Sequence, residues 1–250
     1  MEFRTIDGPV TVNIATMDAL EASVRARFRA REGFALATLN LDHLVKLRQD
    51  RDFASAYQAQ DFVVADGNPV VWLSRLARRP VGLLPGANLV LPLAKWAAAE
   101  GVTVALIGST EDSLAAAGDA LQAQVPDLEI VARIAPPMGF DPDSAVANTV
   151  LRQASEAGAG MAFLALGAPK QEVLAARGRV VVPEMGFASI GAGLDFLAGT
   201  QNRAPVWVQN LALEWLWRML SNPARLAVRY ARCFGILPGL TRDAMKLRNG

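Results

Sequence analysis

The chain has 250 residues, of which 52% are hydrophobic and 20% are charged. This length allows one large domain or two small ones, and the composition excludes a disordered polypeptide, because so apolar a chain must bury most of its side chains to stay soluble. The net charge of +1 conceals an asymmetry. Residues 1–200 contain 17 Lys and Arg against 22 Asp and Glu, a net of −5, whereas residues 201–250 contain 8 against 2, a net of +6.

The single cysteine and the polar start of the chain predict a cytoplasmic protein. Cys233 has no second cysteine to pair with, and Met1-Glu2-Phe3-Arg4 is too polar to begin a secretory signal. The longest uncharged stretch, Pro80–Ala94, is interrupted by glycine, proline and asparagine. We therefore expect no helix that crosses a bilayer.

The chain up to residue 200 alternates short apolar runs with longer amphipathic ones. The short runs predict strands at Val10–Ile14, Phe34–Leu39, Phe62–Val64, Val102–Ile107, Leu128–Ile134, Met161–Leu166 and Val180–Val182. The longer runs predict helices at Met17–Arg29, Leu41–Leu47, Asn68–Leu76, Asn88–Ala99, Ser113–Gln124, Ser144–Glu156 and Gln171–Ala176. This alternation is typical of the α/β class, and we expect a Rossmann-like, doubly wound, mostly parallel sheet.

The alternation stops near residues 199–206, which predicts an α/β core over residues 1–200 and a C-terminal helical appendage over residues 201–250. We expect one helix over Val206–Leu220 and a second that begins at Pro223, since proline suits a first helical position. Basic residues mixed with tryptophans suit an anionic membrane surface, but a helical pair packed on the core with its arginines in water explains the composition equally well. The tryptophans are Trp207, Trp215 and Trp217.

In an open parallel sheet, ligands bind beyond the carboxyl ends of the strands, so the residues that follow the predicted strands are the first candidates for a site. Three such segments stand out, Thr38-Leu39-Asn40, Ala65-Asp66-Gly67-Asn68 and Gly167-Ala168-Pro169-Lys170-Gln171-Glu172. Asp66 precedes a glycine that lets another molecule approach the backbone, which makes it a candidate base beside a bound hydroxyl. Position alone favours the alternative that Asp66 caps the helix beginning near Asn68.

The third segment begins a helix at a proline, which would place amide N–H groups and the positive end of the helix dipole beside Lys170 and Gln171. Such an arrangement favours a phosphate or diphosphate. An ordinary capped helix at the rim of the sheet is the alternative that the residues leave open.

Other motifs point away from metal and cofactor chemistry. Asp50-Arg51-Asp52 and Asp141-Pro142-Asp143 match the Asp-x-Asp pattern that holds a divalent metal on a nucleotide diphosphate, but each lies where a helix starts, and we interpret both as caps. One histidine and one cysteine speak against a zinc site, and we interpret His43 as a helix residue. The glycine pairs in 158–160 and 191–193 lack the third glycine of a dinucleotide fingerprint, and neither a P-loop nor a Gly-x-Ser-x-Gly elbow is present. We therefore expect no metal and no cofactor.

Several segments of the chain carry a specific signature in their order and spacing, although each is modest alone. They are Thr38–Asn40, Ala65–Gly67, Leu166–Glu172, Gly191–Gly199, Arg203–Trp207, Leu213–Arg218 and Pro223–Leu226. Together, from about residue 10 to residue 235, they resemble the bacterial WecG/TagA/CpsF glycosyltransferases.

The resemblance implies an inverting, metal-independent transferase, which moves a sugar from a UDP-sugar to a polyprenyl-diphosphate-linked glycan during cell-surface or exopolysaccharide synthesis at the inner face of the cell membrane. It implies that Asp66 is the general base, and that Arg218, Arg225 and Arg229 close over the site and neutralise diphosphate at the membrane. The candidate substrate-binding residues are Thr38, Asn40, Gly67, Asn68, Gly86, Asn88, Gly108, Gly167, Lys170, Gln171 and Glu172.

The partners expected from this resemblance are the UDP-sugar, the lipid-linked acceptor and the membrane surface, with no nucleic acid. A homo-oligomer stays open, because the Trp and Leu content of the tail would also suit a contact between subunits. One segment departs from the family pattern: members carry Arg-Val-Thr-Gly-Ser/Ala-Asp-Leu where this chain has Leu83–Leu89. Since that arginine is a candidate phosphate contact, Leu83 keeps open a non-catalytic nucleotide-sugar or lipid-diphosphate binding protein of the same fold. A nicotinamide oxidoreductase is a third hypothesis, which NADH binding would test.

Overall fold

A computed structural model describes residues 1–201, 204–205, 207–208, 214–221 and 223–249 of the chain. Its strands are β1 (Glu2–Thr5), β2 (Gly8–Thr11), β3 (Ala35–Leu39), β4 (Phe62–Ala65), β5 (Val104–Gly108), β6 (Ile130–Ile134), β7 (Met161–Ala165) and β8 (Gly186–Ser189). Its helices are α1 (Met17–Ala30), α2 (Leu41–Lys46), α3 (Arg51–Gln58), α4 (Asn68–Leu76), α5 (Gly86–Ala99), α6 (Glu111–Gln124), α7 (Ala145–Glu156), α8 (Lys170–Val181), α9 (Gly193–Leu197), α11 (Glu214–Ser221) and α12 (Pro223–Asn249).

The centre of the molecule is a six-stranded sheet with the order β4-β3-β8-β7-β5-β6, in which all neighbouring strands are parallel. Strands β1 and β2 form a separate antiparallel hairpin. Every residue of β3, β5 and β7 is buried, as expected for strands that are covered on both faces. The α/β class and the Rossmann-like parallel sheet predicted from the sequence are confirmed.

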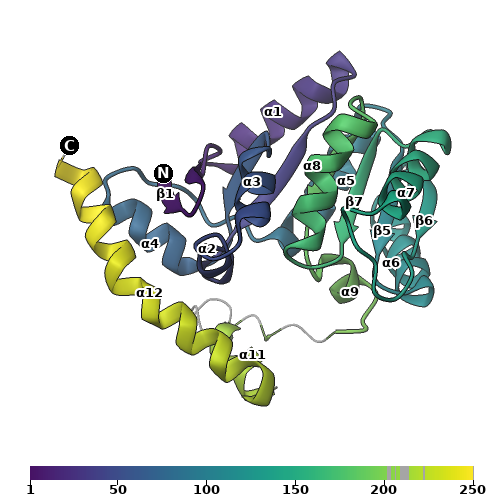
Figure 1. The fold of residues 1–250 in the computed structure, drawn as a ribbon. Helices are drawn as coiled ribbons and strands as arrows, with labels where there is room; N and C mark the ends of the chain where they lie inside the picture. The colour runs from purple at the N-terminus through teal and green to yellow at the C-terminus, as the bar shows by residue number, and fades with distance from the viewer. Residues whose placement is uncertain (202–203, 206, 209–213, 222, 250) are drawn as a thin grey trace.

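Helices cover both faces of this sheet because alternate strand residues point to opposite sides. Leu36 belongs to a hydrophobic cluster with residues of α1, α5, α6 and α9, whereas its neighbour Ala37 belongs to a second cluster with residues of α2, α3, α4 and α12. A third cluster joins β5, β7 and β8 to α7 and α8. Figure 1 shows α3, α8 and α7 side by side over one face of the sheet.

The parallel arrangement brings the carboxyl ends of all six strands to one edge of the sheet. The residues that follow β3, β4, β5, β7 and β8 therefore meet there. Strands β5 and β7 approach closely at these ends. Gly108, at φ 121°, ends β5, and a Cβ added to it would lie 2.5 Å from the carbonyl oxygen of Ala165 at the end of β7. Only glycine fits at this contact.

Three predictions of local structure need correction, and helix α3 was not predicted in full. The predicted strand Val180–Val182 is wrong, because α8 continues through Val181 and the strand lies at Gly186–Ser189. The predicted strand Val10–Ile14 ends earlier, at Thr11, as the second strand of the hairpin. Helix α3 was indicated only by its cap: Asp50 accepts from the backbone N–H of Phe53 at 3.0 Å, as predicted. The cap of α7 is Ser144 instead, while Asp141 accepts from the N–H of Asp143 at 3.0 Å.

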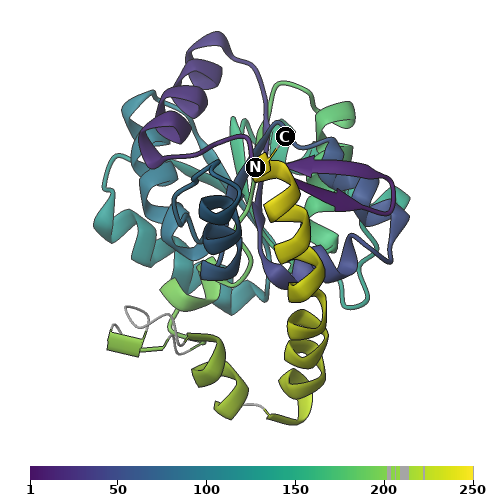
Figure 2. The same ribbon diagram turned by 90° about the vertical axis from the view of Figure 1, so that its left-hand side faces the viewer.

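The C-terminal segment runs along the sheet edge at which the strands end. Figures 1 and 2 show α11 and the first half of α12 on the same side of the molecule as α9, and Figure 1 places α2 and α4 on that side too. Helix α11 matches the second part of the predicted helix over Val206–Leu220, while residues 206 and 209–213 lie outside the described residues. The helix predicted from Pro223 is confirmed as α12. Among the described residues no helix is both long enough and apolar enough to span a membrane.

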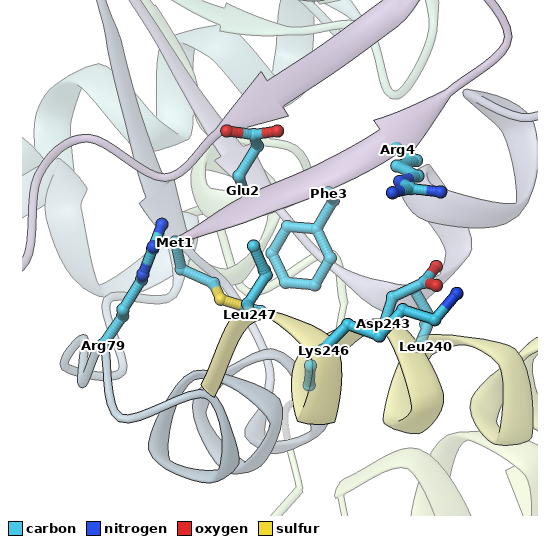
Figure 3. Close-up of a pocket in the computed structure, with 10 residues that line it drawn as sticks. Met1, Glu2, Phe3, Arg4, Arg79, Leu240, Asp243, Lys246 and Leu247 are labelled. Atoms are coloured by element: carbon cyan, nitrogen blue, oxygen red, sulfur yellow. The ribbon is translucent and has the colours of Figure 1, made fainter. Parts of the chain in front are cut away.

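The end of α12 is part of the folded core. Leu240 and Ala244 are buried in the cluster that contains Phe3 of β1. Beside them lies a pocket of about 260 Å³ between the hairpin and α12, into which Phe3 and Leu247 project (Figure 3). None of the predicted site residues is among its lining residues. Both ends of the chain thus meet at this pocket, far along α12 from α11.

Candidate active site

Thr38 and Asp66 lie together where two neighbouring strands end. Strands β3 and β4 pair in register, and the backbone N–H of Asp66 donates to the carbonyl of Leu39 at 2.8 Å. This pairing places the Thr38 hydroxyl, which donates to the Asp66 carboxylate, 3.5 Å from its Oδ2. Thr38 is 3% exposed, whereas Asp66 is half-buried. The result is a half-buried carboxylate that accepts a hydrogen bond from a buried hydroxyl.

The residues flanking this pair shape its surroundings. Gly67, at φ 114°, occupies the N-cap of α4, so the alternative in which Asp66 is the cap residue is wrong. A Cβ on Gly67 would lie 3.9 Å from the Cβ of Asn40, which shows how near these two residues are. Asn40 caps α2, its Oδ1 accepting from the N–H of His43 at 3.0 Å. Asn68 begins α4 and is half-buried.

A buried polar pair lies behind the Thr38–Asp66 pair. His43 is a helix residue, as predicted, and its Nδ1 lies 3.1 Å from the hydroxyl of Tyr57. Burial lowers the pKa of His43 to about 3, so the imidazole is neutral near pH 7. Burial also raises the pKa of Tyr57 well above its usual value, and the nearby carboxylates of Glu172 and Asp66 act in the same direction. The carboxylates of both Asp66 and Glu172 are thus near enough to Tyr57 to act on its hydroxyl.

The start of α8 presents the second predicted group. Pro169 is the N-cap of α8, Lys170 is its first residue, and both are half-buried. The helix has no side-chain cap. Backbone N–H groups at such an uncapped N-terminus attract anions. Gly167, which precedes this turn, has φ 71° and is exposed.

Gln171 and Glu172 point inward instead of toward solvent. Gln171 donates to the Glu172 carboxylate at 2.9 Å and accepts from the N–H of Gly191 at 3.1 Å. The side chain of Gln171 thus joins the start of α8 to the loop after β8. Glu172 is fully buried, and its burial raises the pKa of the carboxyl to about 7.

Comparison with known proteins identifies the family. The model of the WecG/TagA/CpsF glycosyltransferase family matches residues 7–250. The chain belongs to this family. One curated relative is the N-acetylglucosaminyldiphosphoundecaprenol N-acetyl-β-D-mannosaminyltransferase of Bacillus subtilis (strain 168), which is 27% identical over 195 residues, or 77% of this chain and 73% of the relative. The protein is therefore a glycosyltransferase, and the expected resemblance is confirmed.

The segment that departs from the WecG/TagA/CpsF pattern lies beside Asp66. Leu83 forms a β-bridge with Ala65, and the N–H of Leu84 donates to the Ala65 carbonyl at 2.8 Å. Leu83 is 41% exposed, so an apolar side chain stands at the position where the resemblance led us to expect an arginine. Gly86 is buried, and a Cβ added to it would lie 3.2 Å from the carbonyl oxygen of Ile190. Asn88 is exposed on α5.

Of the three tail arginines of this glycosyltransferase, the structure describes the side chain of Arg229. Arg229 donates from Nε to the Asp42 carboxylate at 2.9 Å. Its guanidinium is therefore already engaged in an ion pair on α2. Arg218 and Arg225 belong to α11 and α12, and their side chains lie outside the described part of the structure. Their predicted contact with diphosphate stays a prediction.

Several polar residues at this edge were missed from the sequence. Asp195 of α9 accepts from Ser109 at 2.6 Å, from Ser113 at 3.0 Å and from Gln201 at 2.9 Å. Gly108, a predicted site residue, immediately precedes Ser109, which has φ 54°. Lys46 is a second omission, because its Nζ donates to the Ala168 carbonyl at 3.0 Å. The i, i+4 spacing of Asp42 and Lys46 is a signal that could have predicted their ion pair, but nothing in the sequence indicates the contact with residue 168.

The structure thus brings the predicted residues into two groups at one sheet edge. Thr38, Asn40, Asp66, Gly67 and Asn68 form the first, and Gly167, Lys170, Gln171 and Glu172 form the second. Lys46 of α2 contacts the turn before the second group through the Ala168 carbonyl. Within the described residues, no three His, Cys, Asp or Glu side chains are grouped as a metal site requires.

Proposed function

We propose that this glycosyltransferase moves a sugar from a UDP-sugar to the hydroxyl of a polyprenyl-diphosphate-linked acceptor, with inversion and without a metal. The observation that carries this proposal is the half-buried Asp66 carboxylate, which Thr38 orients at the edge where the strands end. The Bacillus subtilis relative supports the acceptor class, since its name specifies an N-acetylglucosaminyl-diphosphate lipid. The donated sugar stays open.

The reaction begins with the acceptor hydroxyl beside Asp66. The carboxylate takes the hydroxyl proton while the oxygen attacks the anomeric carbon from the face opposite the diphosphate. The new glycosidic bond forms as the bond from carbon to diphosphate oxygen breaks, and UDP leaves with that electron pair. Inversion follows from this single displacement. Thr38 would keep the carboxylate aimed at the hydroxyl throughout.

The departing diphosphate requires positive charge in place of a metal. The N-terminus of α8 supplies backbone N–H groups, and Lys170 supplies a cation in the first turn of this helix. Fixed donors of this kind stabilise a developing anion without having to reorganise. Gln171 and Glu172 are buried, so we assign them the task of holding the helix start in place through the bond to Gly191.

The decisive experiment replaces Asp66 by Asn and measures sugar transfer from a panel of UDP-sugars to a lipid-diphosphate-linked N-acetylglucosamine, with and without a chelator. Loss of a general base costs about 10²–10⁴-fold in rate, and we expect a loss of that size. Asp127→Asn is the matched control, because this exposed aspartate precedes β6 at the opposite edge of the sheet. Unchanged transfer by Asp66→Asn would refute the assigned role, and loss of activity with chelator would refute the metal-free reaction.

A non-catalytic binding protein is the second candidate function, favoured by Leu83. This apolar side chain beside Ala65 leaves the first group of site residues without the cation that the family pattern provides there. Binding of UDP without transfer from any UDP-sugar would support this candidate. Transfer by the wild-type chain would eliminate it.

We further propose that the protein works at the surface of an anionic membrane. Apolar side chains on the C-terminal segment remain exposed, with Trp207 at 63% and Leu220 at 71%. They lie in the part of the chain that carries the net charge of +6. Exposed apolar and basic side chains together suit an anionic lipid surface, which is where a lipid-linked acceptor resides.

A further inference from the structure

Three charged side chains from two helices meet beside the second group of site residues. The Asp42 carboxylate of α2 accepts from Arg229 of α12 at 2.9 Å through Oδ1. Its Oδ2 lies 3.1 Å from the ammonium of Lys46, one helical turn away. Asp42 is 13% exposed, whereas the two cations are more open to solvent. A mostly buried carboxylate thus binds a cation from the C-terminal helix and a cation from its own helix.

Lys46 extends this arrangement to the start of α8. Its Nζ donates to the Ala168 carbonyl at 3.0 Å, although 122 residues separate the two in the chain. Ala168 lies directly before Pro169, the N-cap of α8. Lys46 is therefore one of the side chains that hold the turn into α8. Asp42 is in turn its ion-pair partner.

A second ion pair joins the residues just after α2 to α12 and does not extend to α8. Arg48, which follows α2, lies 4.0 Å from Asp243 of α12. Helix α12 packs on α2, as Figure 1 shows. The two pairs attach the same helix to the same neighbour, but only the Asp42 pair contacts a residue that touches the turn before α8.

We propose that Asp42 is a positioning residue that couples the seat of α12 to the turn before α8, through Arg229 on one side and Lys46 with Ala168 on the other. When Arg229 leaves, Lys46 becomes the sole cation on the carboxylate, and its ammonium is drawn away from the Ala168 carbonyl. Coupling of this kind is reciprocal, so a ligand that fixes the turn also favours the seated α12. That the ligand is a diphosphate rests on the function proposed above.

Hydrogen exchange of the full chain without any ligand tests the coupling directly. We expect Arg229→Gln and Asp42→Asn to raise exchange both in α12 and in the peptide covering residues 166–174. Partly exposed ion pairs support a change of about two- to fivefold. Arg229→Lys should restore the wild-type exchange of residues 166–174, because it keeps the cation. Lys46→Met should raise exchange in residues 166–174 alone.

Arg48→Gln is the matched control. It removes the other ion pair between the α2 segment and α12. We expect faster exchange in α12 and no change of exchange in residues 166–174. If Arg229→Gln also raises exchange in α12 alone, the Asp42 carboxylate only attaches α12 to α2, and the coupling is refuted. A double variant with Asp42→Asn and Arg229→Gln should change residues 166–174 no more than Asp42→Asn does, and additive changes would likewise refute it.

Calorimetry with UDP separates this inference from the proposed function. If the wild type binds UDP, Arg229→Gln should weaken that binding by about the same two- to fivefold, and Arg48→Gln should leave it unchanged. Equal UDP affinity in the wild type and Arg229→Gln would refute the link to ligand binding. If the wild type binds no UDP, the proposed donor is wrong, while the exchange measurements still decide whether Asp42 couples the two segments.

Discussion

Glu172, one of the predicted substrate-binding residues, lies inside the folded core. Its carboxyl is fully buried, accepts from Gln171 at 2.9 Å, and has one oxygen without a hydrogen-bond partner among the described residues. Burying a charge is costly, and this cost accounts for the rise of its pKa to about 7. The protonated form is therefore the one that the folded state favours.

This burial predicts a specific dependence of stability on pH. Because the folded-state pKa of Glu172 lies above the usual 4.5, its stabilising effect is fully present below about pH 4.5 and is lost as the pH rises through about 7. We expect the stability of Glu172→Gln relative to wild type to rise across this window by roughly 1–3 kcal/mol. Chemical denaturation between pH 4 and pH 8 measures the change, and Glu156→Gln, an exposed carboxylate on α7, is the control. A flat difference between variant and wild type would contradict the prediction.

At the scale of elements, the sequence predicts the buried strands and the capped helices well, because their signals are local. Strands β3, β5 and β7 are runs of apolar residues, and Asp50 marks the start of α3. The strand predicted at Val180–Val182 is wrong because these residues end helix α8. The prediction rested on the preference of β-branched residues for strands. Here the contacts of the helix with the sheet override local propensity.

The candidate site was predictable only to the extent that it lies at strand ends. Parallel strands must bring Thr38 and Asp66 to one edge, so their proximity follows from the pattern. The inward direction of Gln171 and the contact from Lys46 to Ala168 do not follow, because they depend on which face of a helix meets which loop. Tertiary packing sets those directions, and a single sequence carries no local signal for them.

An ion-pair cluster between two helices gives a prediction at this scale. Glu100 follows α5 and accepts from Arg25 at 2.7 Å and from Arg29 at 2.6 Å, both on α1. These arginines lower the pKa of Glu100 to about 2. Its stabilising effect is therefore present above about pH 4.5 and is lost as the pH falls through about 2.

We expect Glu100→Gln to lower the midpoint of thermal unfolding by a few degrees at pH 7. The difference from wild type should shrink as the pH falls from 4.5 toward 2, since the wild-type carboxylate then takes up its proton. Added salt should also reduce the difference, because the arginines are partly exposed. Glu129→Gln, which precedes β6 and has no ion pair described, controls for the loss of one negative charge. A difference that grows in acid would show that another interaction of Glu100 dominates.

The molecule carries its net positive charge in the C-terminal tail, residues 201–250. The tail with a net charge of +6 lies along the sheet edge where the two groups of site residues meet. Trp215 packs edge-on against Tyr230 and Phe234, so α11 and α12 form one unit. Because Leu240 and Ala244 of α12 are buried in the core, removal of residues 201–250 would also expose apolar surface. The proposed membrane role of the tail is therefore better tested by point substitutions than by truncation.

Replacement of Trp207 and Leu220 by serine should weaken binding to vesicles that contain an anionic lipid such as phosphatidylglycerol. Both side chains are exposed, so the substitutions remove apolar surface without opening the core. Burial of a large apolar side chain in lipid contributes about 1.5–3 kcal/mol, so loss of the pair should reduce the affinity by about tenfold or more. Met138→Ser is the matched control, because Met138 is a fully exposed apolar residue on the loop after β6. Cosedimentation with vesicles measures the binding, which should also fall with added salt, since exposed charges are screened beyond about 8 Å at physiological ionic strength. Equal binding by the double variant and the wild type would assign the exposed side chains to another surface, such as a contact between subunits.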